Sequence, residues 1–192
     1  MRVVAGKYRS RLLSAPRGVE TRPTSDRLRE TLFNVIAPQI EGAKFVDLYA
    51  GSGAVGIEAI SRGAEFVWFA ENAPVAAKAI RENLRALKIT SECQVEERSA
   101  MALLEGFAKR GTTANLVFLD PPYDAEAEYA RALEFLGSAR GQILLTEDAR
   151  VIAEHRSKTG LAERYGALER VRVLKQGDAA LSFYAMKTTP EL

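Results

Sequence analysis

The residues with the clearest chemical potential are Asp120-Pro121-Pro122-Tyr123, which follow the apolar run 116–119. The exocyclic amino nitrogen of a nucleic-acid base is a poor nucleophile, because its lone pair is delocalised into the ring. The Asp120 carboxylate and the Pro121 carbonyl can accept hydrogen bonds from such an amino group and aim its lone pair at a methyl donor. The prolines fix the loop and remove backbone donors, and Tyr123 offers a flat face to an unstacked base. Asp120, Pro121, Pro122 and Tyr123 are therefore the predicted catalytic residues, for in-line methylation of an amino group.

The aspartate at position 120 also bears on the target base. Guanine presents two adjacent donors, N1-H and the 2-amino group, which match an acceptor-only carboxylate, whereas the edge of adenine suits an amide as well. Taken alone, the same four residues are also compatible with a rigid turn after a strand. The loop therefore predicts amino methylation of a base and leans toward guanine.

A glycine-rich loop lies earlier in the chain. Gly51, Gly53 and Gly56 have G-x-G-x-x-G spacing between a buried run and a helix-like segment, where glycines let a nucleotide-type cofactor approach the backbone closely. The spacing alone also fits a tight turn or a dinucleotide site. Asp47 favours S-adenosylmethionine, because an acid there can hold the cationic methionine moiety but would repel a pyrophosphate. Glu71, after the next strand, can accept both ribose hydroxyls of either cofactor.

The predicted cofactor site gathers residues from the ends of successive strands. Ser99 and Ala100 lie where the adenine edge would be read, although a helix cap at Ser99 explains that residue at least as well. The predicted cofactor-binding residues are Asp47, Tyr49, Ala50, Gly51, Ser52, Gly53, Gly56, Glu71, Asn72, Ser99 and Ala100.

The apolar pattern predicts a scaffold that brings these strand ends together. Apolar runs at 45–49, 66–70, 93–95, 116–119 and 143–145 alternate with helix-like segments at 54–62, 73–88, 100–109 and 126–136. This alternation predicts an α/β fold with a parallel, doubly wound sheet. The runs 168–174 and 179–186 flank Gly177-Asp178 and predict an antiparallel hairpin. A further helix is expected to begin at Thr24 or Ser25 and to end near Pro38.

Basic residues are concentrated at the N-terminus. Residues 1–31 hold eight basic and three acidic side chains, and the remainder holds 19 basic and 22 acidic ones, although the whole chain is only +2. The segment 2–14 partly alternates apolar and basic residues around Gly6, which predicts a hairpin with one cationic face. Such a segment suits phosphate binding, and an ordinary solvated hairpin is the alternative.

Composition restricts the class of protein. A length of 192 residues favours one compact domain. The chain has one cysteine, Cys93, and one histidine, His155, so neither an internal disulfide nor a bound metal is expected. No apolar run approaches the roughly 20 residues of a membrane span, and no signal peptide is visible at the N-terminus. We therefore expect a soluble, cytoplasmic protein that does not associate with membranes.

Three blocks of the sequence together resemble the bacterial RsmD family. They are residues 22–34 (RPTSDRLRETLFN), 49–64 (YAGSG followed by EAISRGA) and 120–123 (DPPY). The resemblance runs from Arg2 to about Tyr184. It implies transfer of a methyl group from S-adenosylmethionine to N2 of a guanine in 16S ribosomal RNA, met within the small subunit or its assembly intermediate, by a protein that we expect to be a monomer.

The resemblance also implies the architecture and the RNA contacts. A Rossmann-like class I methyltransferase with a seven-stranded, mostly parallel sheet is expected over 21–192, ending in an antiparallel hairpin, with a small basic N-terminal hairpin over 1–20. The predicted RNA-binding residues are Arg2, Lys7, Arg9, Arg11, Arg22, Thr24, Arg27 and Arg29. Ala5 and Ser10 stand where the family usually has glycines, and Gln176 stands where it commonly has a tyrosine.

Three other functions stay open at this point. A DNA adenine or cytosine amino-methyltransferase shares the D-P-P-Y loop, but the chain has no large segment for recognising a DNA target. An NAD-dependent oxidoreductase would use only the glycine loop. A non-catalytic RNA-binding module would use only the basic segment.

Overall fold

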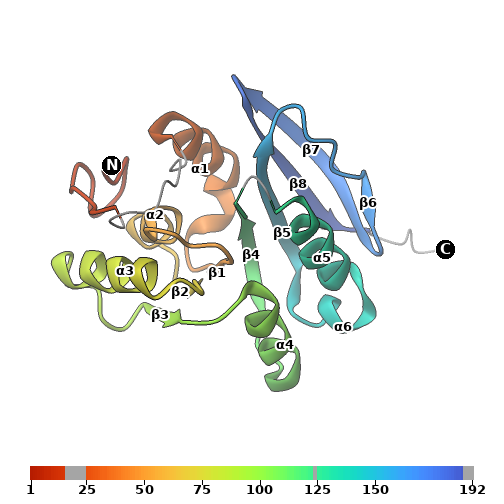
Figure 1. Cartoon of the computed structure of the whole chain (residues 1–192), viewed down its shortest axis with the longest axis horizontal. Helices are drawn as coiled ribbons and strands as arrows, with labels where there is room; N and C mark the ends of the chain where they lie inside the picture. Colours follow the sequence, from red (N-terminus) through yellow and green to blue (C-terminus); the bar gives the residue numbers. More distant parts are fainter. Residues whose placement is uncertain (16–24, 123–124, 188–192) are drawn as a thin grey trace.

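One twisted sheet organises the residues that the computed structural model describes, which are 1–15, 25–122 and 125–187 (Figure 1). Within these ranges the sheet has eight strands in the order β3-β2-β1-β4-β5-β8-β7-β6. The strands are β1 (Lys44–Asp47), β2 (Phe66–Ala70), β3 (Cys93–Glu96), β4 (Ala114–Leu119), β5 (Leu145–Arg156), β6 (Arg164–Tyr165), β7 (Leu168–Gln176) and β8 (Ala179–Met186). Strands β1 to β5 pair in parallel, and β6, β7 and β8 are antiparallel to their neighbours.

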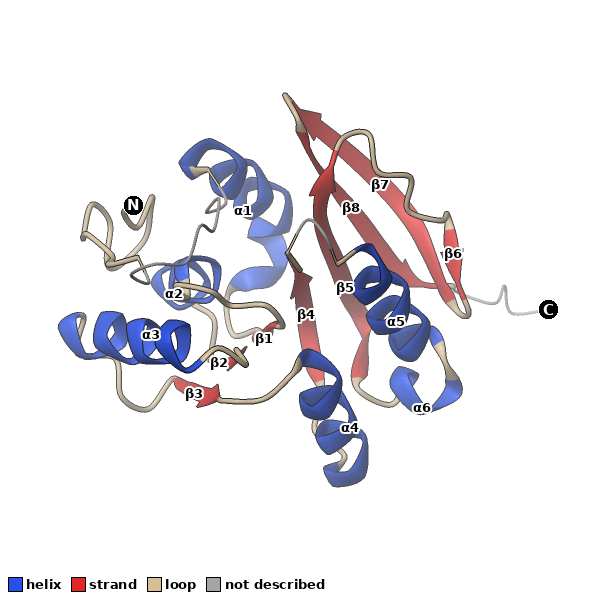
Figure 2. Cartoon of the chain, viewed as in Figure 1, coloured by secondary structure: helices blue, strands red, loops and turns tan. Residues whose placement is uncertain are grey.

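Helices cover both faces of the sheet (Figure 2). They are α1 (Asp26–Ile40), α2 (Ala54–Ser61), α3 (Pro74–Ala86), α4 (Ala100–Arg110), α5 (Glu126–Gly137) and α6 (Ala139–Gln142). Side chains of α1, α2 and α3 share one apolar core with one face of the strands, whereas α4 and α5 share a second core with the other face. Because both faces are covered, β4 is buried at nearly every position, as expected for a central parallel strand.

The predicted fold class is confirmed, with two differences in the strands. The fifth strand is β5, over Leu145–Arg156, and not the predicted run 143–145. Glu147, Asp148 and Arg150 interrupt the apolar pattern of this strand, and its pairing with β4 shifts register between Ala114 and Leu116, so periodicity alone could not find its extent. The two-residue strand β6 adds an eighth member at the edge of the described sheet.

The N-terminal segment folds back on itself, as predicted, but without two continuous strands. An antiparallel bridge joins Arg2 to Leu12, and backbone hydrogen bonds link Val3 to both Ser10 and Arg11. Gly6 and Ser10 have positive φ angles of 81° and 66°, which turn the chain sharply. The segment lies over α2 (Figure 1).

The strand order reverses direction between β1 and β4, so the carboxyl ends of these two strands form the switch point of the sheet. The chain runs outward from β1 through β2 to β3 and then returns to place β4 on the other side of β1. Such a switch point is where open α/β sheets bind ligands. Asp47 pairs with Phe118, so Asp120 lies two residues beyond the level of Asp47. The sequence of strands therefore brings the glycine loop and Asp120 to neighbouring strand ends at one edge of the sheet.

No helix among the described residues is both long and apolar enough to cross a membrane.

Candidate active site

The three glycines of the loop between β1 and α2 have different structural roles. Gly51 and Gly53 have positive φ angles of 54° and 78°, which other residues rarely adopt. A Cβ atom on Gly51 would meet nothing within 4 Å, so this residue faces open space. A Cβ atom on Gly56 would lie 2.2 Å from Cε1 of Phe69, so Gly56 lets α2 pack tightly on β2. The loop is thus open at Gly51 and closely packed against the sheet at Gly56.

Asp47 holds the glycine loop from the end of β1. Its side chain is buried, and Oδ2 accepts a hydrogen bond of 3.0 Å from the backbone N–H of Gly56. Burial raises the pKa of Asp47 to about 7; the Gly56 hydrogen bond opposes this shift, and the charge of Glu71 adds to it. A carboxylate with a pKa near neutrality responds strongly to a cation placed beside it.

Glu71 lies across the loop from Asp47, one residue after β2. Its Oε2 accepts from the N–H of Gly51 at 2.9 Å, and its Oε1 accepts from the N–H of Ala73 at 2.8 Å. A carboxylate has about four acceptor positions, so both oxygens keep the capacity to accept from a ligand hydroxyl. Asn72 is exposed beside it.

The other predicted cofactor residues are placed as follows. Tyr49 donates to Glu128 of α5 at 3.0 Å, and burial raises its pKa well above the ordinary value. Ala50 donates to the carbonyl of Ala70 at 3.1 Å. Ser99 is the N-cap of α4, because its side chain accepts from the N–H of Ala102, and Ala100 is buried as the first residue of that helix. The cap therefore accounts for Ser99 in this structure.

The candidate catalytic loop begins directly after β4. Asp120 is half-buried, Pro121 is buried and Pro122 is exposed. The Pro122 carbonyl accepts from the N–H of Ala125 at 2.8 Å, which leads the chain toward α5. Tyr123, the fourth predicted catalytic residue, lies outside the described residues.

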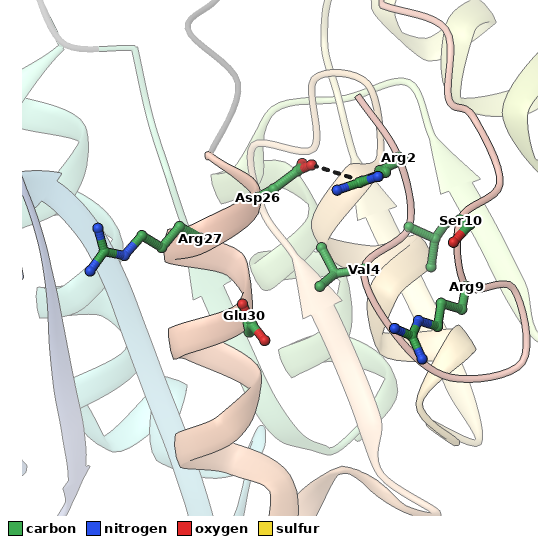
Figure 3. A pocket seen from close by; sticks show the side chains of 8 residues that line it. Arg2, Val4, Arg9, Ser10, Asp26, Arg27 and Glu30 are labelled. Atoms are coloured by element: carbon green, nitrogen blue, oxygen red, sulfur yellow. Dashed lines mark ion pairs between the residues drawn. The ribbon is translucent and has the colours of Figure 1, made fainter.

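Three of the predicted RNA-binding residues, Arg2, Arg9 and Arg27, line a cavity between the N-terminal segment and α1 (Figure 3). The cavity has a volume of about 410 Å³ and is lined by Arg2, Val3, Val4, Arg9, Ser10, Asp26, Arg27 and Glu30. Arg2 pairs with Asp26 at 3.5 Å across it. Lys7 and Arg11 are exposed on the same segment, and Arg22 and Thr24 lie outside the described residues. Neither the glycine loop nor Asp120 lines this cavity.

The structure contradicts one predicted RNA contact. Arg29 is 0% exposed, so it cannot reach an RNA phosphate at the surface. Its Nη2 donates to Asp26 at 2.7 Å and to the carbonyl of Arg2 at 2.5 Å, and its Nε lies 3.6 Å from Glu58. Arg29 therefore fastens α1 to the N-terminal segment and to α2.

Two buried polar residues near the glycine loop escaped prediction. Glu58 of α2 accepts from the N–H groups of Val4 and Ala5, and Asn83 of α3 binds the backbone of Ser14 and Ser52. Polar residues within otherwise apolar helix faces were the available signal, but their partners lie 31 to 69 residues away in sequence.

Among the described residues, no group of three or more histidine, cysteine, aspartate and glutamate side chains is arranged to hold a metal ion.

Comparison with known proteins adds a family to this geometry. The family model described as "Conserved hypothetical protein 95" matches residues 1–185. The Bacillus subtilis protein named "Putative rRNA methyltransferase YlbH" is 37% identical over 184 residues, which cover 96% of this chain and 98% of that protein. The Escherichia coli "Ribosomal RNA small subunit methyltransferase D" is 42% identical over 123 residues, which cover 64% of this chain and 60% of that protein.

A solved structure is similar over nearly the whole chain. The Escherichia coli protein described as "Putative methyltransferase yhhF" has a TM-score of 0.82 and 33% sequence identity, covering 98% of this chain and 99% of that one. The similarity therefore includes the N-terminal segment, the glycine loop and the strand order.

Proposed function

The chain belongs to the RsmD family, and from this premise we propose that it transfers the methyl group of S-adenosylmethionine to the exocyclic N2 amine of a guanine in 16S ribosomal RNA. The observation that carries the proposal is that the glycine loop and Asp120 follow the carboxyl ends of the neighbouring strands β1 and β4. A donor held by the first element would lie beside an amino group held by the second.

The loop residues fit S-adenosylmethionine, which when bound supplies an electrophilic methyl group on a sulfonium. Gly51 faces open space, so the backbone can be approached closely there. Glu71 has acceptor capacity for the ribose hydroxyls, and the buried Asp47 would be stabilised as a carboxylate by the positive methionine moiety. Of the two acids, Asp47 favours this donor over a dinucleotide, because its charge would repel a pyrophosphate.

Asp120 would orient the target amine. Its carboxylate can accept from N1-H and from the 2-amino group of guanine, which aligns the nitrogen lone pair with the methyl carbon. The buried Pro121 provides a backbone carbonyl without an accompanying donor. The transfer breaks the sulfur–carbon bond as the nitrogen–carbon bond forms, and the proton of the methylated amine then leaves to solvent.

Ribosomal RNA is the proposed partner because of the relatives' names and the basic N-terminal segment. Arg2, Arg9 and Arg27 line one cavity, and Lys7 and Arg11 are exposed nearby. Side chains of this kind bind phosphates and position RNA without reading its sequence. We propose that the substrate is the RNA within the small ribosomal subunit or its assembly intermediate. We also propose that the enzyme acts as a monomer in the cytoplasm.

Mapping of the methylated nucleoside tests the function directly. The protein is incubated with labelled S-adenosylmethionine and with undermethylated small subunits, naked 16S RNA or DNA, and the labelled nucleosides are separated after digestion. We expect N2-methylguanine in the RNA of the particle. Label only in N6-methyladenine would refute the guanine assignment, and label confined to DNA would favour a DNA amino-methyltransferase.

A further inference from the structure

The N-terminal segment is built into the part of the fold that carries the glycine loop. All eight residues of α2, the helix that follows this loop, are buried. Glu58 accepts from the N–H groups of Val4 and Ala5 at 2.7 and 2.9 Å, and Ser61 donates to the carbonyl of Ala5 at 2.6 Å. A short helix at the molecular surface would normally expose one side to water. Here the N-terminal segment covers that side.

Asn83 connects this segment to the glycine loop itself. Its Oδ1 accepts from the N–H of Ser14 at 2.8 Å, and its Nδ2 donates to the carbonyl of Ser14 and to the carbonyl of Ser52, each at 3.0 Å. The side chain is only 3% exposed. The side-chain amide of Asn83 thus donates one N–H to the N-terminal segment and the other to the glycine loop.

The Ser52 carbonyl is a sensitive point of the loop. Ser52 lies between Gly51 and Gly53, which both adopt left-handed backbone conformations. Glycine can also adopt other backbone conformations at little cost, so these two residues do not by themselves fix the loop. The hydrogen bond from Asn83 to this carbonyl is buried. A buried carbonyl that loses its donor is destabilised, so the loop without Asn83 would shift toward conformations that expose Ser52.

We propose that Asn83 is a positioning residue that couples docking of the N-terminal segment to the cofactor-binding conformation of the glycine loop. The inference rests on the proposed function, in that the ligand of the loop is S-adenosylmethionine. It follows that the segment proposed to contact RNA and the loop proposed to hold the methyl donor influence each other through the Asn83 side chain, alongside the direct hydrogen bond of 3.3 Å from the Ser52 hydroxyl to Sδ of Met1. Such coupling is reciprocal by thermodynamic necessity.

Calorimetric titration with S-adenosylhomocysteine tests the first half of the proposal. Asn83→Ala is expected to weaken binding about tenfold, because it leaves the Ser52 carbonyl without its buried donor. Asn115→Ala is the matched control. Asn115 of β4 is less buried than Asn83 but likewise accepts from a backbone N–H, that of Lys44 at the start of β1, the end of this strand that lies away from the glycine loop. The control should lose stability and keep the affinity of the wild type.

The second half is tested without mutating Asn83, in case Asn83→Ala does not fold. Ser14→Pro removes the N–H that Asn83 accepts and leaves the bond from Asn83 to Ser52 in place. We expect this variant to bind S-adenosylhomocysteine about threefold more weakly, because it loses one hydrogen bond to Asn83 but keeps the bond from Asn83 to Ser52. Saturating S-adenosylhomocysteine should in turn slow amide exchange at Ser14 in the wild type, a ligand effect that a merely structural asparagine would not produce.

The outcomes separate the two levels of the proposal. Failure of the wild type to bind S-adenosylhomocysteine would overturn the proposed function together with this inference. Binding by the wild type with equal affinity in folded Asn83→Ala would overturn the inference alone. Weak binding by Asn83→Ala, with unchanged affinity in Ser14→Pro and unchanged exchange at Ser14, would make Asn83 an anchor of the loop and refute the coupling.

Discussion

The buried carboxylate of Asp47 predicts a measurable pH dependence of stability. Its pKa is raised to about 7 from an ordinary value of 3.8, chiefly by burial. The folded state therefore holds this proton over a pH range in which the unfolded chain has already released it. Stability from this group is fully present below pH 3.8 and is lost as the pH rises to about 7. Above that pH the charged side chain remains a constant destabilising contribution.

Replacing Asp47 with asparagine removes the charge and keeps an oxygen that can accept from Gly56. Between pH 5 and pH 8, the free energy of unfolding of the wild type should fall by about 3 kcal/mol relative to Asp47→Asn, from 1.36 kcal/mol per unit of pKa difference. The variant should also bind S-adenosylmethionine more weakly, because it lacks the negative charge opposite the methionine moiety. At pH 8 the Asp47→Asn variant would thus gain stability relative to the wild type while losing affinity for S-adenosylmethionine.

Urea unfolding of both proteins at the two pH values measures this difference. The comparison cancels the titration of other groups, including His155, whose pKa is lowered by burial. A difference between wild type and variant that is the same at pH 5 and pH 8 would refute an Asp47 pKa near neutrality. Equal affinity for S-adenosylmethionine would refute its proposed contact with the cofactor.

Three further predictions concern the candidate catalytic residue Asp120, the packing of α2 on β2, and the proposed RNA surface. Asp120→Ala should abolish methylation and leave RNA binding nearly intact, measured by label transfer and filter binding; turnover at the wild-type rate would contradict the role of Asp120. Gly56→Ala should destabilise the fold by about 1–3 kcal/mol in urea titrations, because its Cβ would overlap Phe69, and an unchanged midpoint would exclude that clash. The double variant Arg9→Ala and Arg27→Ala should bind RNA more weakly. The slope of the logarithm of its binding constant against the logarithm of salt concentration should become shallower by about one for each phosphate contact that is lost. An unchanged salt slope would place RNA elsewhere.

Local patterns were enough to predict the elements of the candidate active site. The glycine spacing, the acid at the end of β1 and the D-P-P-Y loop are each contained in a few consecutive residues, and strand–helix alternation brings them to one edge of the sheet. Ser25 illustrates the same point, since its predicted cap of α1 is made to the N–H of Leu28, only three residues away.

Long-range polar contacts account for what was missed. Arg29 was expected at an RNA surface because it belongs to an arginine-rich block, yet Glu58 and Asp26 hold it in the interior. Nothing in the sequence near Arg29 marks a partner that lies 29 residues later. The extent of β5 was not predicted for a related reason. The first half of this strand is charged and resembles a loop in sequence, and it is a strand because its backbone pairs with β4.

The docking of the N-terminal segment has a consequence for the order in which the chain acquires its structure. The segment is synthesised before Glu58, Ser61 and Asn83, which hold it in the folded protein. Domains generally fold as units during synthesis. The N-terminal segment therefore cannot dock until α2 and α3 have been made, and the contacts around the glycine loop are completed by residues that were synthesised before it.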